Sequence, residues 1–332
     1  MNKILTISIA AYRVEQYLAE CLDSFTDPRI AGDLEVLVIN DGSGDGIRDI
    51  AREYEKKYPD VFRLIDKENG GHGSTINRGI AEAKGTYFKT VDGDDLVHPQ
   101  GLYDLVSYLR TAEEDLVVTD FESFDNETGQ VLQEMGTDFA GKKIRQRYFF
   151  DEISRYVYIN MHAAAFRTSV LKGMGRQLDE HCFYVDAEYM MYPVPGVETI
   201  VFLDQPVYRY RLGRDEQSMN IRNMQKNMAH HERVLAHLLE FYQKEQTGMT
   251  DAKRAYVAKG IARIAVSQIK IYLSYPAHGE WKKKIRALEE GLKQNYPAVY
   301  HSMSNPAVAL LRCTGYIFYP TVSRLCRRTY KV

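Results

Sequence analysis

The chain lacks the cysteine spacings, the long apolar runs and the one-signed charge that mark several classes of protein. Its 332 residues include four cysteines, none of them in a CxxC pair, so neither a zinc ribbon nor a disulfide framework is expected. No apolar run reaches the roughly 18 residues of a membrane-spanning helix. Lysine and arginine number 43 against 45 aspartate and glutamate, which excludes a global positive field for nucleic acid.

Two glycine-rich nucleotide-binding patterns are also missing. Neither GxxxxGK[ST] nor GxGxxG occurs in the chain, which disfavours nucleotide kinases and dinucleotide-dependent dehydrogenases. The opening segment MNKILTISIAAYRVE contains an apolar run that is too short, and too soon followed by Arg13 and Glu15, for a signal peptide. We therefore expect a cytoplasmic location.

What the chain does contain is a regular alternation of β and α patterns. Short β-branched runs predict strands, and amphipathic stretches predict helices. Strands are expected at 4–10, 34–40, 62–66 and 87–91, and helices at 14–25, 47–58 and 74–84. This order predicts an α/β fold with a mainly parallel, doubly wound sheet, whose ligands lie beyond the carboxyl ends of the strands.

The last third of the chain has a different pattern. Beyond residue 220 the apolar spacing is helical, with helices expected at 252–275 and 281–294 and a break at 246–250. These patterns divide the chain into a catalytic domain at 1–219, a helical region at 220–305 and a tail at 306–332.

The strongest chemical signal is the segment Thr90-Val-Asp-Gly-Asp-Asp-Leu96, which places three carboxylates at the end of a predicted strand. Carboxylates packed this closely raise one another's pKa unless a cation compensates them. Oxygen ligands favour Mg²⁺ or Mn²⁺. The alternative is that these side chains only cap a helix beginning near Pro99.

Two further polar clusters follow predicted strands. Asn40-Asp41-Gly42-Ser43 closes the second strand, and Asp41 could accept hydrogen bonds from a base or ribose. Its alternative role is that of an ordinary turn residue. The segment 68–77 (ENGGHGSTIN) precedes a helix, and its glycines can expose amide donors to an anion.

These motifs, in this order, resemble the inverting family 2 glycosyltransferases of GT-A fold across roughly residues 3–219. The matching pieces are ISIAAYRVEQYLAECLDS, LEVLVINDGSGD, ENGGHGSTINRGIAEAKGTYFKTVDGDDLVHP, FYVDAEYMMYPV and VYRYRLGRDEQSMN. The resemblance implies a nucleotide-diphosphate sugar donor, with a UDP-hexose favoured, and Mn²⁺ or Mg²⁺ as cofactor.

The resemblance also implies roles for individual residues. Asp92-Gly93-Asp94 matches the DxD element, with Asp94 as metal ligand and Asp92 near the ribose or metal. Asp186 matches the base that deprotonates the acceptor hydroxyl. The remaining donor-site matches surround the nucleotide: Ala10 and Tyr12 beside it, Asp41 on the base, and Asn69, Gly71 and Asn77 at the glycine-rich turn.

The chain departs from the family pattern at the diphosphate. Ile76 stands where the family commonly has arginine, and Arg78, His72 or Arg211 could supply the missing cation. Two residues beyond the predicted base, Glu188 is expected at the surface or against the acceptor rather than in a catalytic pair.

The resemblance implies transfer of one sugar at a time to a saccharide or lipid-linked saccharide in cell-surface polysaccharide synthesis, because the Gln-x-x-Arg-Trp element of processive enzymes is absent. A nucleotidyltransferase and an inactive sugar-binding protein of the same fold are the alternatives. The 306–332 tail combines aromatic residues with five basic ones and no acid, which favours contact with an anionic membrane surface. Its alternative role is a helix packed on the fold.

Overall fold

The computed structural model describes residues 3–44, 46–213 and 220–330. The chain forms two compact units, which we call the sheet unit (residues 1–214) and the helical unit (residues 215–332).

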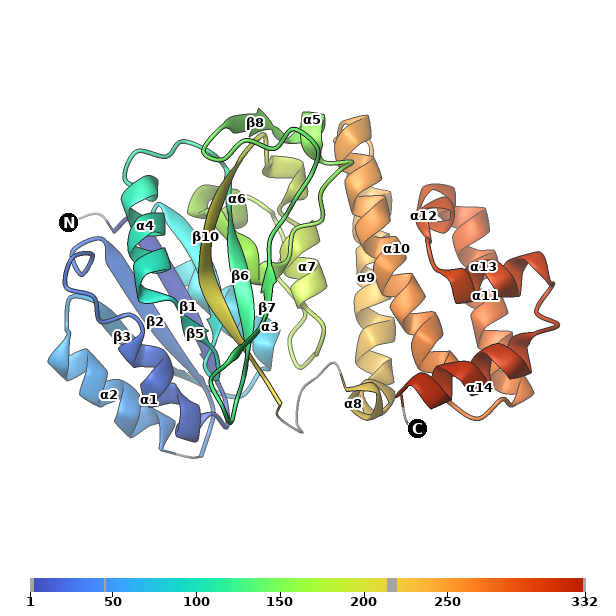
Figure 1. The fold of residues 1–332 in the computed structure, drawn as a ribbon, viewed down its shortest axis with the longest axis horizontal. Coiled ribbons are helices and arrows are strands. Elements are labelled where there is room, and N and C mark those ends of the chain that lie inside the picture. The colour runs from blue at the N-terminus through green and yellow to red at the C-terminus, as the bar shows by residue number, and fades with distance from the viewer. Residues whose placement is uncertain (1–2, 45, 214–219, 331–332) are drawn as a thin grey trace. The chain divides into compact units, whose positions relative to one another are not determined.

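The described part of the sheet unit contains one ten-stranded sheet with helices around it (Figure 1). The strands are β1 (Leu5–Ala11), β2 (Leu34–Asp41), β3 (Phe62–Lys67), β4 (Tyr87–Asp92), β5 (Leu96–Val97), β6 (Leu116–Asp125), β7 (Val131–Met135), β8 (Arg147–Phe149), β9 (Ala164–Arg167) and β10 (Thr199–Leu212). The helices are α1 (Glu15–Asp23), α2 (Ile47–Lys57), α3 (His72–Glu82), α4 (Pro99–Leu109), α5 (Phe150–Ile153), α6 (Thr168–Lys172) and α7 (Asp186–Met191), with short 3₁₀ turns η1 (Met161–Ala163) and η2 (Val194–Gly196).

The order of the strands brings distant segments together at one edge. The sheet runs β3-β2-β1-β4-β9-β6-β10-β5, with β7 beside β6 and β8 beside β10. Strands β3, β2, β1 and β4 are parallel neighbours, whereas β9 is antiparallel to both β4 and β6. The carboxyl ends of β2, β1 and β4 therefore meet, and the antiparallel β9 brings the η1 turn beside the end of β4.

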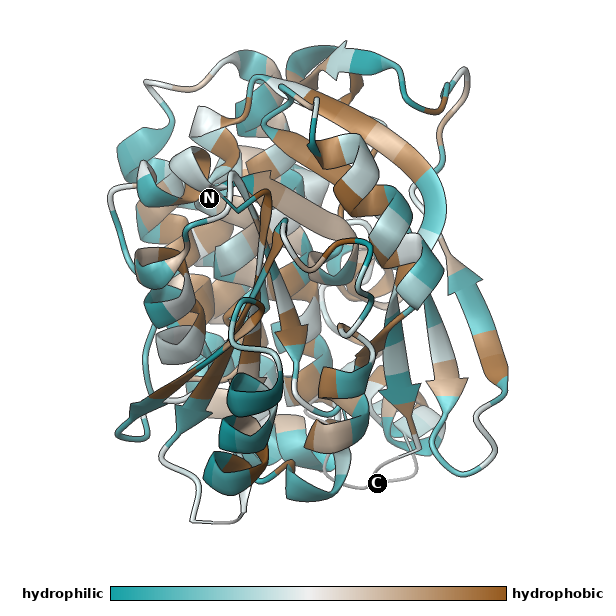
Figure 2. Ribbon diagram, turned by 90° about the vertical axis from the view of Figure 1, so that its left-hand side faces the viewer, coloured by the Kyte–Doolittle hydropathy of each residue, from teal (hydrophilic) through white to brown (hydrophobic). Residues whose placement is uncertain are grey.

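The core of the sheet unit lies along these parallel strands. Every residue of β2 is buried, and β1 and β4 are almost wholly buried, as expected for strands covered on both faces. Figure 2 shows brown, apolar residues concentrated on the strands and teal, polar residues on many helix surfaces and loops.

The helical unit is formed by α8 (Ile221–Lys226), α9 (Met228–Glu245), α10 (Asp251–Leu273), α11 (Gly279–Asn295), α12 (Pro297–Ser302), α13 (Pro306–Cys313) and α14 (Tyr319–Tyr330). Helices α9 and α10 are joined by a buried 2.6 Å contact between His231 and Gln268. Helix α14 is tied to the end of α10 by the Ser323 hydroxyl, which donates to the carbonyl oxygens of Leu273 and Tyr275. Among the described residues, no helix combines the length and apolarity needed to cross a bilayer.

The predicted elements are confirmed. All the strands and helices expected in residues 4–91 are present, with bounds within two residues of those predicted, and the break at 246–250 separates α9 from α10. The largest shift is at α3, which begins at His72 instead of Ser74. The α/β fold with a mainly parallel sheet is likewise confirmed.

Candidate active site

Three neighbouring strands end in the polar segments that the sequence singled out. In the parallel register, Ala10 of β1 lies opposite Asp92 of β4, and Ala11 lies opposite Asn40 of β2. Asp41, the last residue of β2, lies opposite Lys67 of β3. The edge thus contains two acidic corners: the Asp41 corner, and the Asp92 corner formed by residues 92–95.

At the Asp41 corner the protein satisfies its own carboxylate. Asp41 is 2% exposed. One carboxylate oxygen accepts from Lys67 Nζ at 2.6 Å, from the Gly70 N–H at 2.9 Å and from the Ser74 hydroxyl at 3.3 Å. The other accepts from the Gly71 N–H at 2.8 Å and from Asn69 Nδ2 at 3.1 Å. The predicted donor-binding residues Asp41, Asn69 and Gly71 are therefore brought together, as parts of one folded turn.

The conformation of this turn requires glycine at position 71. Gly71 has φ of 80°, and a Cβ there would lie 3.3 Å from the Cα of His181. A side chain would thus be strained by its backbone angle and crowded by the following segment. The turn leads directly into α3, whose first residue is His72.

At the Asp92 corner a tight turn is held from two strands. Gly93 N–H donates to the Ala10 carbonyl at 3.0 Å, and a Cβ on Gly93 would lie 2.9 Å from that oxygen. Asp95 is buried and accepts from the Tyr208 hydroxyl at 2.6 Å and from the Arg211 N–H at 2.7 Å. Strand β10 therefore fixes the far end of the turn.

The two carboxyl groups in this turn have opposite pKa shifts. Burial raises the pKa of Asp95 well above its ordinary value, and the charge of Asp92 raises it further. Burial opposes ionisation of Asp92 as well, but the ion pair with His72, whose Nε2 lies 3.2 Å from Asp92 Oδ1, outweighs it and lowers the Asp92 pKa. Asp92 therefore carries the negative charge of the pair at neutral pH.

His72 has the reciprocal shift. Burial disfavours its protonated form, yet the close contact with Asp92 and the charges of Asp92, Asp186 and Asp41 outweigh this and raise its pKa. Its place at the first residue of α3 puts this imidazole at the edge where the acids gather.

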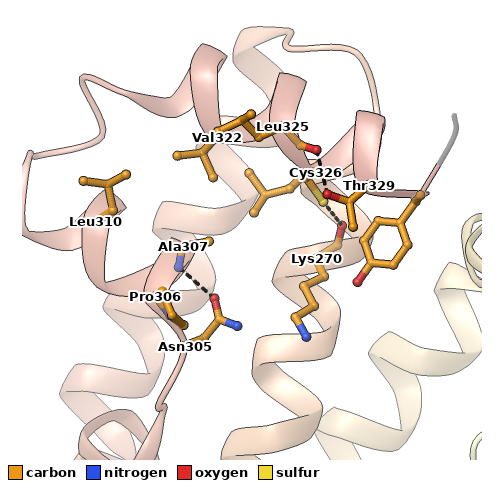
Figure 3. Close-up of a pocket in the computed structure, with 11 residues that line it drawn as sticks. Lys270, Asn305, Pro306, Ala307, Leu310, Val322, Leu325, Cys326 and Thr329 are labelled. Carbon is orange, nitrogen blue, oxygen red and sulfur yellow. Dashed lines mark hydrogen bonds between the residues drawn. The ribbon is translucent and has the colours of Figure 1, made fainter.

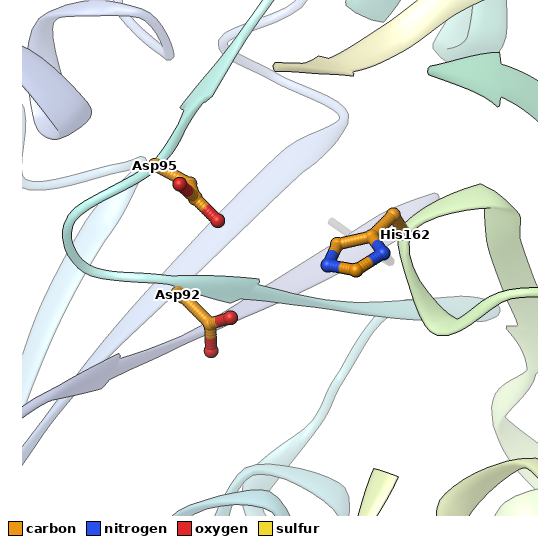
Figure 4. Close-up of side chains that lie close together, drawn as sticks. All are labelled: Asp92, Asp95 and His162. Carbon is orange, nitrogen blue, oxygen red and sulfur yellow. The ribbon is translucent and has the colours of Figure 1, made fainter. Parts of the chain in front are cut away.

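A third group faces the same turn from η1. Ligand atoms of Asp92, Asp95 and His162 all lie within 4.8 Å of one another, and Figure 4 draws these three side chains. Burial lowers the pKa of His162 to about 4, so its imidazole is neutral and able to coordinate a metal. Two carboxyl groups and a neutral imidazole are a donor set that fits Mn²⁺.

This cluster contains Asp92 but a different second carboxylate from the one predicted. Asp94 is only half-buried, and its carbonyl oxygen accepts from Arg211 Nε at 2.6 Å. Coordination by the Asp94 carboxylate stays a prediction. The capping alternative is wrong: the side chain that accepts at the N-terminus of α4 is His98, through the Gly101 N–H.

Asp186 is the first residue of α7, and the segment before it is fastened to the glycine-rich turn. The amide of Asn77 exchanges two hydrogen bonds with the backbone of Leu178, at 2.9 and 3.0 Å. The His181 N–H donates to the Gly70 carbonyl at 2.5 Å. His181 and Tyr184 both have positive φ, a conformation that side chains adopt at an energetic cost.

Asp186 is accessible to solvent, yet surrounding protein is dense enough to disfavour its charge. Burial raises its pKa, with the charge of Asp92 adding to the rise, while the charge of His72 and two backbone N–H groups oppose it. An exposed carboxylate with a raised pKa has the properties of a general base.

The structure corrects the prediction for Glu188. Glu188 is fully buried, and its carboxylate accepts from the Asp179 N–H at 2.8 Å and from the Tyr192 hydroxyl at 3.0 Å. The predicted surface position of Glu188 is therefore wrong. Its carboxylate lies inside the fold because it accepts hydrogen bonds from the segment before α7 and from α7 itself.

The two arginine candidates for the diphosphate have other partners. Arg78 forms an ion pair with Glu82, one turn farther along α3. Arg211 is buried, with its guanidinium 2.7 Å from Glu20 and hydrogen-bonded to the Asp94 carbonyl. Of the three predicted cations, His72 is the one whose side chain lies against Asp92.

The remaining predicted residues lie in the first loop. Tyr12 is exposed beside the end of β1, with the guanidinium of Arg13 5.1 Å from its ring centroid. The Ala10 carbonyl is occupied by the Gly93 N–H. The loop is held against β2 by the Arg13 N–H, which donates to the Ser43 hydroxyl at 3.1 Å.

Sequence reasoning missed three residues of this site: Lys67, His162 and Tyr208. Lys67 could have been found by aligning the ends of β2 and β3, which puts opposite charges side by side. Tyr208 lies in the piece VYRYRLGRDEQSMN that matches the family, but its contact with Asp95 depends on the pairing of β10 with β5. No local signal marks His162, which reaches the corner through the antiparallel β9.

Comparisons with known proteins point to one family. The model of the family described as "Glycosyl transferase family 2" matches residues 6–175, which is more than half of the chain. Putative glycosyltransferase EpsH of Bacillus subtilis is 28% identical over 224 residues, which cover 63% of this chain and 60% of that protein. Uncharacterized glycosyltransferase EpsJ of the same organism is also 28% identical, over 64% of this chain and 62% of that protein. The chain thus spans about three fifths of the length of these relatives.

Solved structures show the same fold. The crystal structure of S. aureus TarS 1-349 in complex with UDP-GlcNAc aligns with a TM-score of 0.67 at 17% identity, over 98% of this chain and 92% of that one. Mannosyltransferase PcManGT from Pyrobaculum calidifontis, in complex with GDP-Man and Mn²⁺, aligns with a TM-score of 0.52 at 16% identity, over 100% of this chain and 85% of that one. The sheet unit has the GT-A type of fold.

Proposed function

Because the chain belongs to glycosyl transferase family 2, we propose that it is a metal-dependent inverting glycosyltransferase. It moves one sugar from a nucleotide-diphosphate sugar to a saccharide or lipid-linked saccharide acceptor in cell-surface polysaccharide synthesis. One observation carries the proposal: His72 lies 3.2 Å from Asp92 and lowers the pKa of that carboxyl group, whereas burial outweighs the charge of His72 at Asp186 and raises the Asp186 pKa. Carboxyl groups pushed apart in this way are suited to separate roles.

A UDP-hexose is the favoured donor. UDP-GlcNAc is the ligand bound by TarS, which shares the fold. In the proposed complex the nucleotide lies over the glycine-rich turn, with Tyr12 beside the base and the backbone at Ala10 lining the pocket. Asp41 shapes this surface through the Gly70 and Gly71 amides. The resemblance implies a direct contact between Asp41 and the base. Such a contact would compete with the hydrogen bonds that Asp41 accepts from the Gly70 and Gly71 amides.

We assign the divalent cation to the Asp92 corner, held by Asp92 and Asp94, with Asp95 and His162 as the neighbouring donors. A bound Mn²⁺ or Mg²⁺ would offset the charge that builds on the departing diphosphate. The His72 imidazole lies 3.2 Å from Asp92 and adds a second positive charge there when it is protonated, and the Arg211 contacts keep the turn in place.

Asp186 is the proposed base. The accessible carboxylate accepts the proton of the acceptor hydroxyl as that oxygen attacks the anomeric carbon on the face opposite the diphosphate. An α-linked donor then gives a β-linked product. Asn77 contributes indirectly, because its two bonds to Leu178 hold the segment that leads to Asp186.

For location, we propose a cytoplasmic enzyme that contacts the inner face of the membrane through residues 306–332. A lipid-linked acceptor would be reached there. The five basic residues of this segment and its lack of acids support this part of the proposal.

The test is release of UDP from UDP-GlcNAc and related donors in the presence of Mn²⁺. Asp186→Asn should lower turnover by ~10²-fold or more while UDP affinity changes little, because the base acts only in the chemical step. Glu53→Gln, at an exposed carboxylate of α2, is the matched control and should behave as the wild type. Turnover by Asp186→Asn close to that of the wild type would refute the assignment of the base.

A further inference from the structure

The helical unit exposes apolar side chains in one short segment. Large apolar residues are exposed at eleven described positions of the chain, and five of these lie between residues 310 and 330. The most exposed are Ile317 at 76%, Leu325 at 56% and Phe318 at 49%. Exposed apolar residues gathered in this way are typical of surfaces that meet an apolar partner.

These side chains are not exposed through loose packing. Asn305 caps α13 through the N–H groups of Ala307 and Val308. Arg312 of α13 forms a buried ion pair with Glu289 of α11, at 2.5 Å. On α14, Tyr319, Val322 and Ser323 are buried.

The turn between α13 and α14 is equally well defined. Gly315 and Tyr316 both have positive φ, and the Tyr316 N–H donates to the Leu311 carbonyl at 2.8 Å. Ile317 and Phe318 follow at once and project from a folded turn.

Beside this segment lies an apolar groove of about 350 Å³ between α10, α13 and α14 (Figure 3). Leu273, Pro306, Leu310, Val322 and Leu325 supply much of its wall, and Lys270 lies at one side. Its volume is in the ~300–1,000 Å³ range of pockets that hold small molecules. Three of the exposed apolar residues, Leu310, Leu325 and Tyr330, themselves line the groove.

The part of the chain that forms the groove is rich in basic residues. Residues 251–332 contain fifteen lysines and arginines but four aspartates and glutamates, whereas the whole chain has nearly equal numbers. Of these four acids, Glu289 is buried against Arg312. On α14 itself, Arg324 and Arg328 are exposed on the same helix as Leu325.

We propose that α13, the 314–318 turn and α14 form a docking site for an anionic phospholipid bilayer, in which the groove takes one hydrocarbon chain of a lipid. Ile317, Phe318 and Leu325 enter the interface, and Arg324 and Arg328 contact lipid phosphates. Apolar side chains beside basic ones are the pattern of helices that lie on membranes. A soluble polyanion would use the arginines but leave Ile317 and Phe318 in water, which is why a bilayer fits better.

This site lies within the helical unit; it rests on the membrane contact in the proposed function and names the residues that make it, but it does not depend on sugar transfer. Its test therefore needs no donor. The full-length protein is co-sedimented with vesicles of phosphatidylcholine alone and with vesicles containing 30% phosphatidylglycerol. The wild type should bind the anionic vesicles at least tenfold more tightly, and the preference should weaken at high salt.

Two double variants divide the site into its apolar and basic parts. Ile317→Ser/Phe318→Ser should lower affinity for anionic vesicles at least tenfold. Arg324→Gln/Arg328→Gln should abolish most of the preference for anionic over neutral vesicles. The matched control is Val131→Ser/Leu132→Ser, which removes two exposed apolar residues from β7 in the sheet unit and should bind as the wild type.

The groove is tested with a monomeric ligand. Calorimetry should show that dodecyl phosphate binds. Inorganic phosphate, which has no hydrocarbon chain, and dodecyl maltoside, which has no charge, should both bind much more weakly. Ala307→Phe should block binding of dodecyl phosphate because the larger side chain fills the groove. Circular dichroism at 222 nm confirms that each variant is folded, and UDP release from the donor should be unchanged in all of them.

Three outcomes would overturn the proposal. One is absence of wild-type binding to anionic vesicles. Another is equal loss of binding in the Val131→Ser/Leu132→Ser control. The third is binding of inorganic polyphosphate together with failure to bind vesicles, which would make the surface a polyanion site. Each is independent of whether the protein transfers sugar.

Discussion

The two acidic corners come from similar sequence but differ in how the protein treats their charge. Each is an aspartate at the carboxyl end of a buried parallel strand. Asp41 is enclosed and accepts five hydrogen bonds. One comes from Lys67, the last residue of β3, and the other four come from residues that follow β3 in the chain. Asp92 keeps part of its carboxylate in solvent, and its ion-pair partner is a histidine.

The difference follows from what lies next to each strand. Beside β2 is β3, whose end supplies a lysine and is followed by a glycine-rich turn whose amides donate to Asp41. On the outer side of β4 is the antiparallel β9, and the η1 turn that precedes β9 supplies a neutral imidazole. A carboxylate that its own fold satisfies stabilises structure, whereas one left with charge and access can bind a cation. The position of an aspartate at a strand end is therefore not enough to assign its role.

The largest expected effect comes from Asp92→Asn. Removing the charged carboxylate of the Asp92 corner should lower kcat/KM for UDP release by ~10²-fold or more, because a preorganised charge at the reaction centre is lost. Its melting temperature should change little, since the carboxylate is partly solvated. Activity assays and differential scanning calorimetry on the same preparations give both numbers. Normal activity of a folded Asp92→Asn protein would show that the Asp92 corner, like the Asp41 corner, has no charge that the reaction needs.

Asp41→Asn should show the opposite pattern, with stability falling first. A half-buried lysine and two backbone N–H groups lose their anionic acceptor, which costs about 3 kcal/mol in the free energy of unfolding. Urea unfolding measures this cost. In a cycle with Lys67→Met, the two substitutions should couple by ~1–3 kcal/mol. Independent effects would mean that the 2.6 Å contact contributes little.

The arginines sharpen the comparison at smaller scale. Arg211→Lys should weaken Mn²⁺-dependent UDP binding by ~10- to 100-fold, because lysine cannot reproduce the planar contacts to Glu20 and the Asp94 carbonyl. Arg78→Lys is the matched control, since its exposed pair with Glu82 is worth ~0.5 kcal/mol or less. Calorimetric titration of UDP with and without Mn²⁺ separates the two. Equal losses in both variants would contradict the positions described for them.

Much of this picture could be predicted from sequence. Hydrophobic periodicity located the parallel strands and their helices, because each element is encoded within its own residues. The acidic strand ends and the glycine-rich turn were also visible, and they identified the correct edge of the sheet.

What could not be predicted depends on long-range pairing. His162 and Tyr208 reach the Asp92 corner because β9 and β10 pair with strands far away in sequence. The internal hydrogen bonds of Glu188 form only when the segment from 178 onward folds back on α7. Periodicity within a segment contains no information about such neighbours.

The smallest expected effect lies outside both corners and provides a baseline for pH studies. Burial lowers the pKa of His231 in α9, against the opposing effect of its contact with Gln268. The unfolded chain then binds more protons than the folded one just below pH 6.5, so stability should fall as the pH drops from about 7 to 5. His231→Gln should flatten this dependence, as measured by urea unfolding across pH. An unchanged slope would assign the acid sensitivity to other groups.

The central claim is that only the Asp92 corner retains charge for a divalent cation on the donor diphosphate. The most direct measurement is electron paramagnetic resonance titration of Mn²⁺ in the presence of UDP. Wild-type protein and Asp41→Asn that remains folded should both remove the free Mn²⁺ signal, while Asp92→Asn should leave most of it. Equal Mn²⁺ uptake by Asp92→Asn and the wild type, or loss of uptake confined to Asp41→Asn, would contradict the account.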